Sequence, residues 1–305
     1  MDSIRSRTGV SVEVIDLHFQ GKPGRIASFL IRHGSGAMLI ESGPGSTIGG
    51  LEFELGRRGL APSDITHLLL THIHLDHAGA AGWLAGHGAQ VYVHPRGAPH
   101  LVDPTRLLES AGRIYGDEMD RLWGECLPVP QAQITTLDDG DEVAVGGVGV
   151  VALDTPGHAE HHLSFLLDDI CFTGDVAGVR MPHSGVVIPP APPPEFAPER
   201  WRRSLAHIAA QRPEYLALTH FGLFLDPPEH LAALRRGLQA LCEWADENVA
   251  QAEDVARLQA RYADWLQAWA LEQGLDPADW PGHQAINPAW MSALGLRRYW
   301  KQRQG

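Results

Sequence analysis

The pattern of apolar and polar residues along the first half of the chain predicts short strands that alternate with helices. Compact apolar runs bounded by Gly, Pro or polar turns are typical of strands, and apolar residues three or four positions apart are typical of helices. Helices are predicted over Ile48–Arg58, which Gly59 ends, and over Ala80–Gly86. The strands are predicted at Val12–Leu17, Ala27–His33, Ala37–Glu41, His67–Leu70 and Gln90–His94. This order is typical of a layered α/β fold.

The second half repeats the theme more loosely. Residues 98–125 are predicted to be helical, and a helix over Glu199–Ala210 precedes a strand over Tyr215–Thr219. Further strands are predicted within Glu142–Leu153, Leu163–Leu167 and Ile170–Phe172. Residues 186–198 hold six prolines, which exclude a helix interior or a central strand, so this segment is predicted to be an extended, semi-rigid loop.

After Asp226 the pattern becomes helical. One helix face is predicted from Leu231, Leu234, Leu238 and Leu241, and a second from Val255, Leu258, Tyr262, Trp265 and Trp269. We therefore expect a catalytic domain over residues 1–226 and a helical extension over 227–305 that packs on it. Six of the nine tryptophans lie between 244 and 300, where packing between helices is favoured over a wall of a ligand pocket.

Composition and net charge favour some classes of binding partner over others. The chain is 44% hydrophobic and carries a formal charge of −13, which disfavours nucleic acid and favours a small-molecule substrate. Its three cysteines are far apart, so neither a disulfide framework nor a thiolate zinc site is expected. Residues 1–10 lack the apolar core of a secretory signal, and no apolar run is long enough to cross a membrane. We expect a cytoplasmic protein, with a homodimer as an open alternative.

Four possible metal ligands lie close together in the run His72-Ile73-His74-Leu75-Asp76-His77, directly after a predicted strand. A single histidine has many ordinary roles, but three histidines and an aspartate this close together indicate a shared cation. Neutral imidazoles and carboxylates are the usual ligands of zinc and its neighbours. Further candidates follow predicted strands later in the chain, where nearby glycines allow tight turns: His158, Asp175 and His220.

The motif H-x-H-x-D-H, followed in order by TPGH, TGD and TH, resembles the metallo-β-lactamase superfamily over residues ~12–225. The resemblance implies a four-layer αββα sandwich with two metal ions at one edge. It implies that Asp175 bridges the two ions. It also implies one ion held by His72, His74 and His158, and the other by Asp76, His77 and His220. Zinc is the expected metal, and manganese or iron suit the same ligands.

By this resemblance the protein is a dinuclear hydrolase, of the glyoxalase- and lactonase-like kind, that cleaves a lactone, ester or thioester with a metal-bridging hydroxide. Asp76 is expected to hold the proton of the hydroxide and pass one to the leaving group. Glu41, where the family usually carries Asp, and His162 are expected to orient the ligands. His161 replaces a glycine that is usual in the family.

The segment from Gly178 to Pro194 follows Asp175 and is expected to form a rigid apolar wall for an acyl or ring substrate. Within it, Arg180 and Ile188 are expected to contact the substrate. The family's lactonases usually place a tyrosine near the metals, and no tyrosine lies between Asp175 and the proline-rich loop. Two alternatives stay open: a mononuclear iron dioxygenase that acts on a persulfide, and a non-catalytic binding protein that is stabilised by metal.

Overall fold

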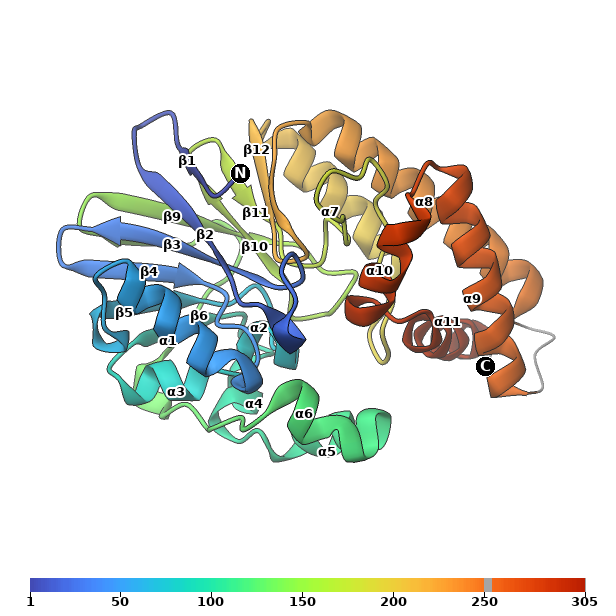
Figure 1. The fold of residues 1–305 in the computed structure, drawn as a ribbon, viewed down its shortest axis with the longest axis horizontal. Helices are drawn as coiled ribbons and strands as arrows, with labels where there is room; N and C mark the ends of the chain where they lie inside the picture. Colours follow the sequence, from blue (N-terminus) through green and yellow to red (C-terminus); the bar gives the residue numbers. More distant parts are fainter. Residues whose placement is uncertain (250–253, 305) are drawn as a thin grey trace.

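Two β-sheets lie face to face in the computed structural model, which describes residues 1–249 and 254–304 (Figure 1). The first sheet has seven strands in chain order. They are β1 (Ser3–Arg5), β2 (Ser11–Asp16), β3 (Ala27–His33), β4 (Gly36–Ile40), β5 (Ile65–Leu69), β6 (Gln90–Val93) and β7 (Ile134–Thr136). Strands β1 to β4 pair antiparallel, and β4 to β7 pair parallel.

The second sheet has six strands in the order β13-β12-β11-β10-β9-β8. They are β8 (Glu142–Val145), β9 (Val148–Asp154), β10 (Leu163–Leu167), β11 (Ile170–Phe172), β12 (Tyr215–Leu218) and β13 (Gly222–Phe224). Strands β11 and β12 are parallel, and the other pairs are antiparallel. The crossover between β11 and β12 contains the proline-rich loop and α7 (Pro198–Ala210).

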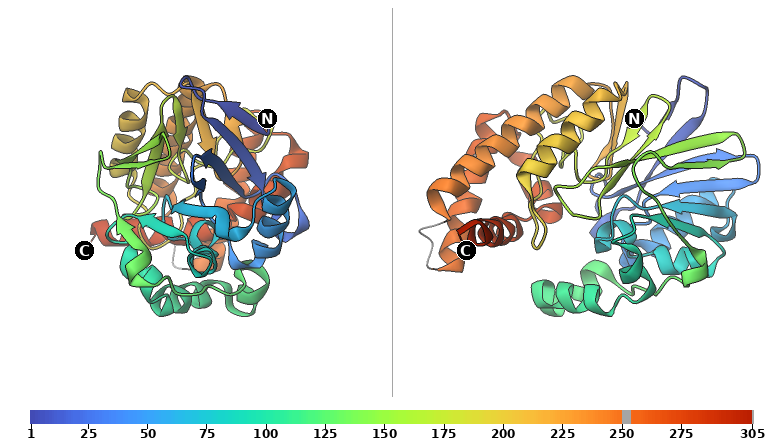
Figure 2. Two further views of the ribbon diagram at one scale, coloured as in Figure 1. Left: turned by 90° about the vertical axis from the view of Figure 1, so that its left-hand side faces the viewer. Right: turned by 180° about the vertical axis from the view of Figure 1, so that it is seen from behind.

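Helices cover the outer face of each sheet, as the two views of Figure 2 show. The first sheet is covered by helices that connect its parallel strands. They are α1 (Ile48–Arg57), α2 (Leu75–Ala78), α3 (Ala81–Gly86), α4 (Ala98–Val102), α5 (Thr105–Tyr115) and α6 (Met119–Trp123). The second sheet is covered by α7 and by α8 (Pro227–Asn248). Between the sheets, apolar side chains such as Phe29, Met38 and Phe172 form a separate core. The predicted αββα sandwich is therefore confirmed.

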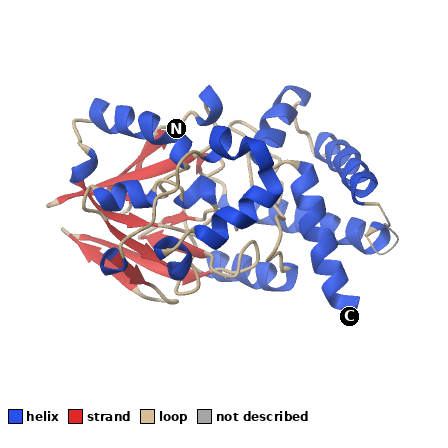
Figure 3. Ribbon diagram, turned by 90° about the horizontal axis from the view of Figure 1, so that it is seen from below, coloured by secondary structure: helices blue, strands red, loops and turns tan. Residues whose placement is uncertain are grey.

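Beyond α8, the C-terminal helices gather at one end of the sandwich (Figure 3). They are α9 (Val255–Glu272), α10 (Trp280–Ile286) and α11 (Ala289–Gln304). Trp244, Tyr262 and Trp300 belong to the same apolar cluster as Trp201 of α7, which confirms that the tryptophan-rich stretch is largely core. The division at residue 226 stays a prediction: α8 begins at Pro227, yet its apolar face is continuous with the outer layer of the sandwich. No helix in the described ranges is long and apolar enough to cross a membrane.

Local differences from the predicted elements follow from backbone chemistry. The helical stretch over 98–125 is divided into α4, α5 and α6, because Pro104 follows α4 and Gly116 takes a positive φ of 52° after α5. The three-residue strands β1, β7 and β13 were not predicted, because they are not compact apolar runs such as the equally short β11.

Candidate metal centre

The polar residues of the predicted site come together at one edge of the sandwich, each just beyond a strand. The run that begins at His72 follows β5, and its last two ligand candidates lie on the single-turn helix α2. His158, Asp175 and His220 follow β9, β11 and β12. Strand ends in a layered α/β fold meet at a common edge, so residues far apart in the sequence become neighbours.

The loop that carries His158 needs a glycine at the preceding position. Gly157 has a φ of 145°, and a Cβ there would lie 2.4 Å from the Cα of Trp201. Only glycine lets the backbone of this loop approach α7 so closely. The approach places His158 opposite the histidines that follow β5.

One cluster consists of three imidazole nitrogens. The Nδ1 atom of His74 lies 2.9 Å from Nε2 of His72 and 3.0 Å from Nε2 of His158. A second cluster contains Asp76, whose Oδ2 atom lies 3.4 Å from Nε2 of His220 and 3.8 Å from Nε2 of His77. Each set has its donor atoms within 4.8 Å of one another, close enough to hold one metal ion.

Asp175 lies between the two clusters and faces both. Its Oδ2 atom is 3.4 Å from Nε2 of His158. Its Oδ1 atom is 3.3 Å from Nε2 of His77 and 3.5 Å from Nε2 of His220. Both Oδ1 of Asp175 and Nε2 of His77 are buried without a hydrogen-bond partner among the described residues. Unpaired buried polar atoms are costly, and a shared cation would satisfy both.

In three of the histidines the ring nitrogen that faces away from the site, Nδ1, has a hydrogen-bond partner. Nδ1 of His158 donates to the carbonyl oxygen of Pro190 at 3.1 Å, and Nδ1 of His220 donates to that of Arg25 at 2.8 Å. Nδ1 of His77 lies 3.0 Å from a carboxylate oxygen of Glu41. A neutral imidazole that donates from one nitrogen carries a lone pair on the other. In all three rings Nε2 faces the site, and a metal ion that replaces its proton would find the lone pair there.

In His72 the hydrogen-bond partner of Nδ1 is the hydroxyl of Thr71. The hydroxyl of Thr71 donates to Glu41, so it is free to accept from Nδ1 of His72 at 3.0 Å. Burial lowers the pKa of His72 well below its usual value, and burial lowers that of His74 to about 4. The rings of the first cluster are therefore neutral, which is the form that binds metal.

In the second cluster the carboxylates dominate. Burial alone lowers the pKa of His77, but Asp175, Asp76 and Glu41 outweigh it and raise that pKa well above its usual value. Burial raises the pKa of Asp76, but His77 and His220 lower it to about 2. This concentration of negative charge attracts a cation, and a divalent ion meets the same electrostatic demand as a proton on His77.

Glu41 forms hydrogen bonds with residues on both sides of the second cluster. It is fully buried with a φ of 67°, and one carboxylate oxygen receives hydrogen bonds from the hydroxyls of Thr71 and Thr219 as well as from His77. The other oxygen accepts the backbone N–H of Thr71 at 3.3 Å. The longer side chain, where the family usually has Asp, thus reaches Thr71 just after β5, the candidate ligand His77 on α2 and Thr219 just after β12.

Replacing Glu41 with Gln is expected to weaken metal binding about 10- to 100-fold, as loss of an outer partner of a ligand typically does. The amide NH₂ would meet the N–H of Thr71 or the Nδ1–H of His77, so one hydrogen bond to the carboxylate is lost. Titration with zinc in the presence of a competing chelator measures the effect. Glu52→Gln, on the exposed face of α1, is the matched control. Unchanged affinity in Glu41→Gln would show that Glu41 does not orient the ligands.

Neither ring nitrogen of His162 is available to a metal ion. Its Nε2 atom accepts the backbone N–H of Asp175 at 3.2 Å, and its Nδ1 atom lies 3.0 Å from the hydroxyl of Thr155. Both ring nitrogens are therefore used, and the ring supports the backbone that presents Asp175. The role of His162 in orienting the ligands stays a prediction.

A pocket of about 240 Å³ opens over the clusters and reaches His74, Asp76, His158 and Asp175. One wall is α5, and a second is the proline-rich loop through Pro190 and Pro192 to Pro194. Of the segment expected to form an apolar wall, Gly178 to Pro194, only the prolines from Pro190 onward line the pocket. The C-terminal helices add a third wall through Ile286, Asn287 and Met291. The extension is thus part of the pocket as well as part of the core.

Two polar residues of this pocket, Tyr115 and His161, had been given no role from the sequence. Tyr115, at the end of α5, lines it and contacts Met291 of α11 through its hydroxyl at 3.1 Å. A tyrosine near the metal ligands therefore exists, but it comes from a segment before the TPGH motif, where no signal pointed to it. His161 also lines the pocket, with its ring stacked on that of His72 and its Nε2 atom 3.5 Å from Glu195.

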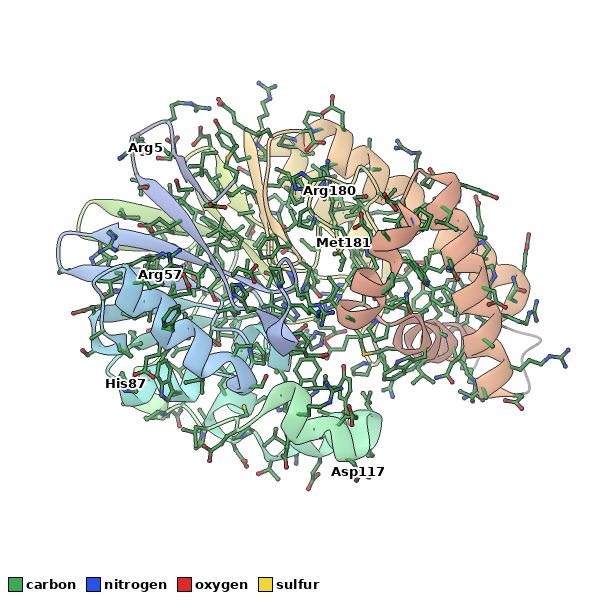
Figure 4. All side chains as sticks on the ribbon, viewed as in Figure 1. Arg5, Arg57, His87, Asp117, Arg180 and Met181 are labelled. Carbon is green, nitrogen blue, oxygen red and sulfur yellow. The ribbon has the colours of Figure 1, made fainter. Side chains whose placement is uncertain are left out.

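Arg180 and Ile188 are not among the described residues that line this pocket. Arg180 pairs with Asp226 at 2.8 Å and lies over the ring of Phe224, in a separate hollow. Figure 4 shows Arg180 in the upper part of the molecule, whereas Asp117, which follows α5, lies at its lower edge. Ile188 is 1% exposed in the outer core. Neither of the substrate contacts predicted for this pocket is therefore formed, because an ion pair occupies one side chain and core packing the other.

Comparison with known proteins identifies the family. Residues 21–220 match the model of the metallo-beta-lactamase superfamily, and the chain belongs to this superfamily. The archaeal superfamily protein ST1585 from Sulfolobus tokodaii has a similar fold, with a TM-score of 0.67 over 96% of this chain and 99% of that one, at 22% identity. TTHA1429 from Thermus thermophilus gives a TM-score of 0.66 over 96% and 94%, at 21% identity.

Two relatives have names that state an activity. The hydroxyacylglutathione hydrolase of Aeromonas hydrophila is 26% identical over 48% of this chain and 44% of its own length. The atrochrysone carboxyl ACP thioesterase of Aspergillus fumigatus is 32% identical over 51% and 42%. ST1585 itself is 32% identical over 52% of this chain and 61% of its own length. The chain thus spans about two fifths to three fifths of these relatives. Their names place hydrolases in the superfamily.

Proposed function

We propose that the protein is a dinuclear metal-dependent hydrolase that cleaves a carbonyl-type bond in a lactone, ester or thioester. The observation that supports this most is the direction of the imidazole lone pairs. In four rings Nε2 faces the centre while Nδ1 is engaged by Pro190, Arg25, Glu41 or Thr71, so each ring can offer the lone pair of Nε2 to a metal ion. Asp175 faces both clusters with one oxygen each.

In this proposal the first ion is held by the three rings of the first cluster, the second by the other set, and Asp175 joins them. The ligands are His72, His74 and His158 for one ion and Asp76, His77 and His220 for the other. Two divalent ions, zinc by preference, would lower the pKa of a water molecule and polarise the carbonyl when bound.

The protein's own residues supply position and proton transfer. Asp76 lines the pocket and its side chain is 20% exposed, so its carboxylate can hold the proton of the attacking water and pass one to the leaving group. The apolar walls exclude bulk water and receive the acyl part of the substrate. The names of the two hydrolase relatives favour a thioester among the candidate bonds.

Elemental analysis together with a substrate panel tests the proposal. We expect two zinc equivalents per chain, turnover of at least one thioester, lactone or aryl ester, loss of turnover on chelation, and recovery when zinc is restored. One iron per chain with oxygen consumption on a persulfide would contradict the proposal. Two bound metals without turnover of any panel member would favour a metal-stabilised binding protein instead.

A further inference from the structure

A second hollow adjoins the metal pocket on the C-terminal side of the proline-rich loop. It is an open groove of about 510 Å³, and Pro193 lines both the groove and the pocket. We call it the basic groove, and its lining consists of Pro193, Leu294, Arg297, Arg298, Lys301 and Gln302. The groove and the pocket thus meet at Pro193.

The lining of the basic groove contains three cations and no carboxylate. Within the described residues, none of the three forms an ion pair or a side-chain hydrogen bond, and Nε of Arg297 is buried without a partner. Two acids that contact α11 do so away from the groove: Glu199 accepts from Tyr299, and Asp246 accepts from Trp300. In a chain with a net charge of −13, such an acid-free cluster is not expected from composition. Helix-dipole effects favour cations in the last turn of α11, but they do not explain why no acid pairs with them.

The groove and the pocket share one face of α11. Met291 lines the pocket, and Leu294, Arg298 and Lys301 line the groove. Their spacing of three and four residues places all four on one helical stripe. A rise of 1.5 Å per residue puts Lys301 about 15 Å beyond Met291 along the helix axis.

Close packing holds this stripe in register with the pocket. A Cβ at Gly295 would lie 2.0 Å from the carbonyl oxygen of Ala191, so the backbone of α11 rests directly on the proline-rich loop. The backbone N–H of Ala191 also donates to the hydroxyl of Ser292 at 3.2 Å. The cations are therefore at a fixed distance from the metal centre.

We propose that the basic groove binds the phosphate-bearing part of a thiol carrier whose acyl thioester lies over the metal centre. This inference rests on the proposed hydrolase function and specifies its substrate class. Guanidinium groups match phosphate oxygens in pairs, and Lys301 adds a further positive charge. A phosphopantetheine arm separates its sulfur from its phosphate by a length comparable to the stripe, and the pocket of about 240 Å³ would receive the acyl group.

The reaction balances as a simple hydrolysis. Water forms a C–O bond to the acyl carbon, the C–S bond breaks, and the departing thiolate takes the proton that Asp76 passes on. The acid product leaves the apolar pocket, and the free thiol carrier leaves the groove. The carrier is either free coenzyme A or the same arm on a carrier protein, since both present the same phosphate and thioester.

Two thioesters with one acyl group test the groove in the zinc-loaded enzyme: butyryl-coenzyme A, and butyryl-N-acetylcysteamine, which lacks phosphate. In Arg298→Ala/Lys301→Ala we expect kcat/KM for the coenzyme A thioester to fall about ten-fold or more, mainly through KM. Turnover of the phosphate-free thioester should be unchanged. Arg203→Ala, which removes an exposed cation of α7, should alter neither substrate, and Arg298→Lys/Lys301→Arg should restore most of the loss. Butyryl attached to a phosphopantetheinylated carrier protein shows which source is preferred.

Binding provides a readout that does not depend on catalysis. Calorimetry with coenzyme A and the metal-free protein should show affinity that weakens with salt and falls in Arg298→Ala/Lys301→Ala. If the double variant lowers neither this affinity nor the preference for coenzyme A thioester, the groove assignment is wrong even when both thioesters are cleaved. If neither thioester is cleaved but coenzyme A binds through these cations, the hydrolase proposal fails and the groove assignment stands.

Discussion

Replacing Asp175 with Asn is expected to remove metal and activity together. The carboxylate faces both clusters, with Oδ2 at 3.4 Å from Nε2 of His158 and Oδ1 at 3.3 Å from Nε2 of His77. Asparagine keeps the size of the side chain but has only one acceptor and no charge. It therefore cannot satisfy two cations. We expect fewer than two metal equivalents per chain and a loss of kcat/KM above about 100-fold, beyond the usual effect of removing an outer partner.

Elemental analysis and turnover of the same purified sample check this expectation. Asp117→Asn, an exposed carboxylate after α5, is the control and should keep both metals and full turnover. An unchanged circular dichroism spectrum would show that the variant loses metal without misfolding. An Asp175→Asn enzyme with two metals and normal turnover would rule out the bridging role.

Replacing Asp76 with Asn is expected to separate catalysis from metal binding. Its Oδ2 atom lies 3.4 Å from Nε2 of His220, and the side chain also lines the pocket. An amide oxygen can still coordinate a metal, but it cannot take up a proton at neutral pH. We expect kcat to fall about 10²- to 10⁴-fold, the usual effect of losing a general acid or base, while more metal is retained than in Asp175→Asn.

Side-by-side metal analysis and steady-state kinetics of the two variants make the comparison. If Asp76→Asn loses both metals as completely as Asp175→Asn, then Asp76 acts only as a ligand. If its turnover is normal, the proton-transfer role is excluded.

Much of the centre could be predicted because its chemistry is local in the sequence. Four candidate ligands lie within His72–His77, and the others follow strands in short glycine-containing motifs. Their partners could not be predicted in the same way. The carbonyl groups of Pro190 and Arg25 orient His158 and His220, and a backbone carbonyl has no sequence signature. Such contacts depend on how the loops pack, not on residue type.

The predictions of substrate contacts were wrong because they relied on closeness in the sequence. Arg180 follows Asp175 by five residues, but its guanidinium pairs with Asp226, which lies beyond β13. Tyr115 and Met291 are 176 residues apart, yet their side chains meet at the pocket. A side chain goes where packing and charge satisfy it, and neighbours in the sequence do not determine that.

By itself, the sequence determined the sandwich and the candidate ligands, because periodic apolar residues bury one face of each element and clustered imidazoles and carboxylates favour metal binding. Tertiary structure alone decided which nitrogen of each ring faces the centre, how Glu41 supports it, and that the C-terminal helices complete the pocket. Those features arise from contacts between segments far apart in the chain. Their geometry exists only once the two sheets have packed and α11 rests on the proline-rich loop.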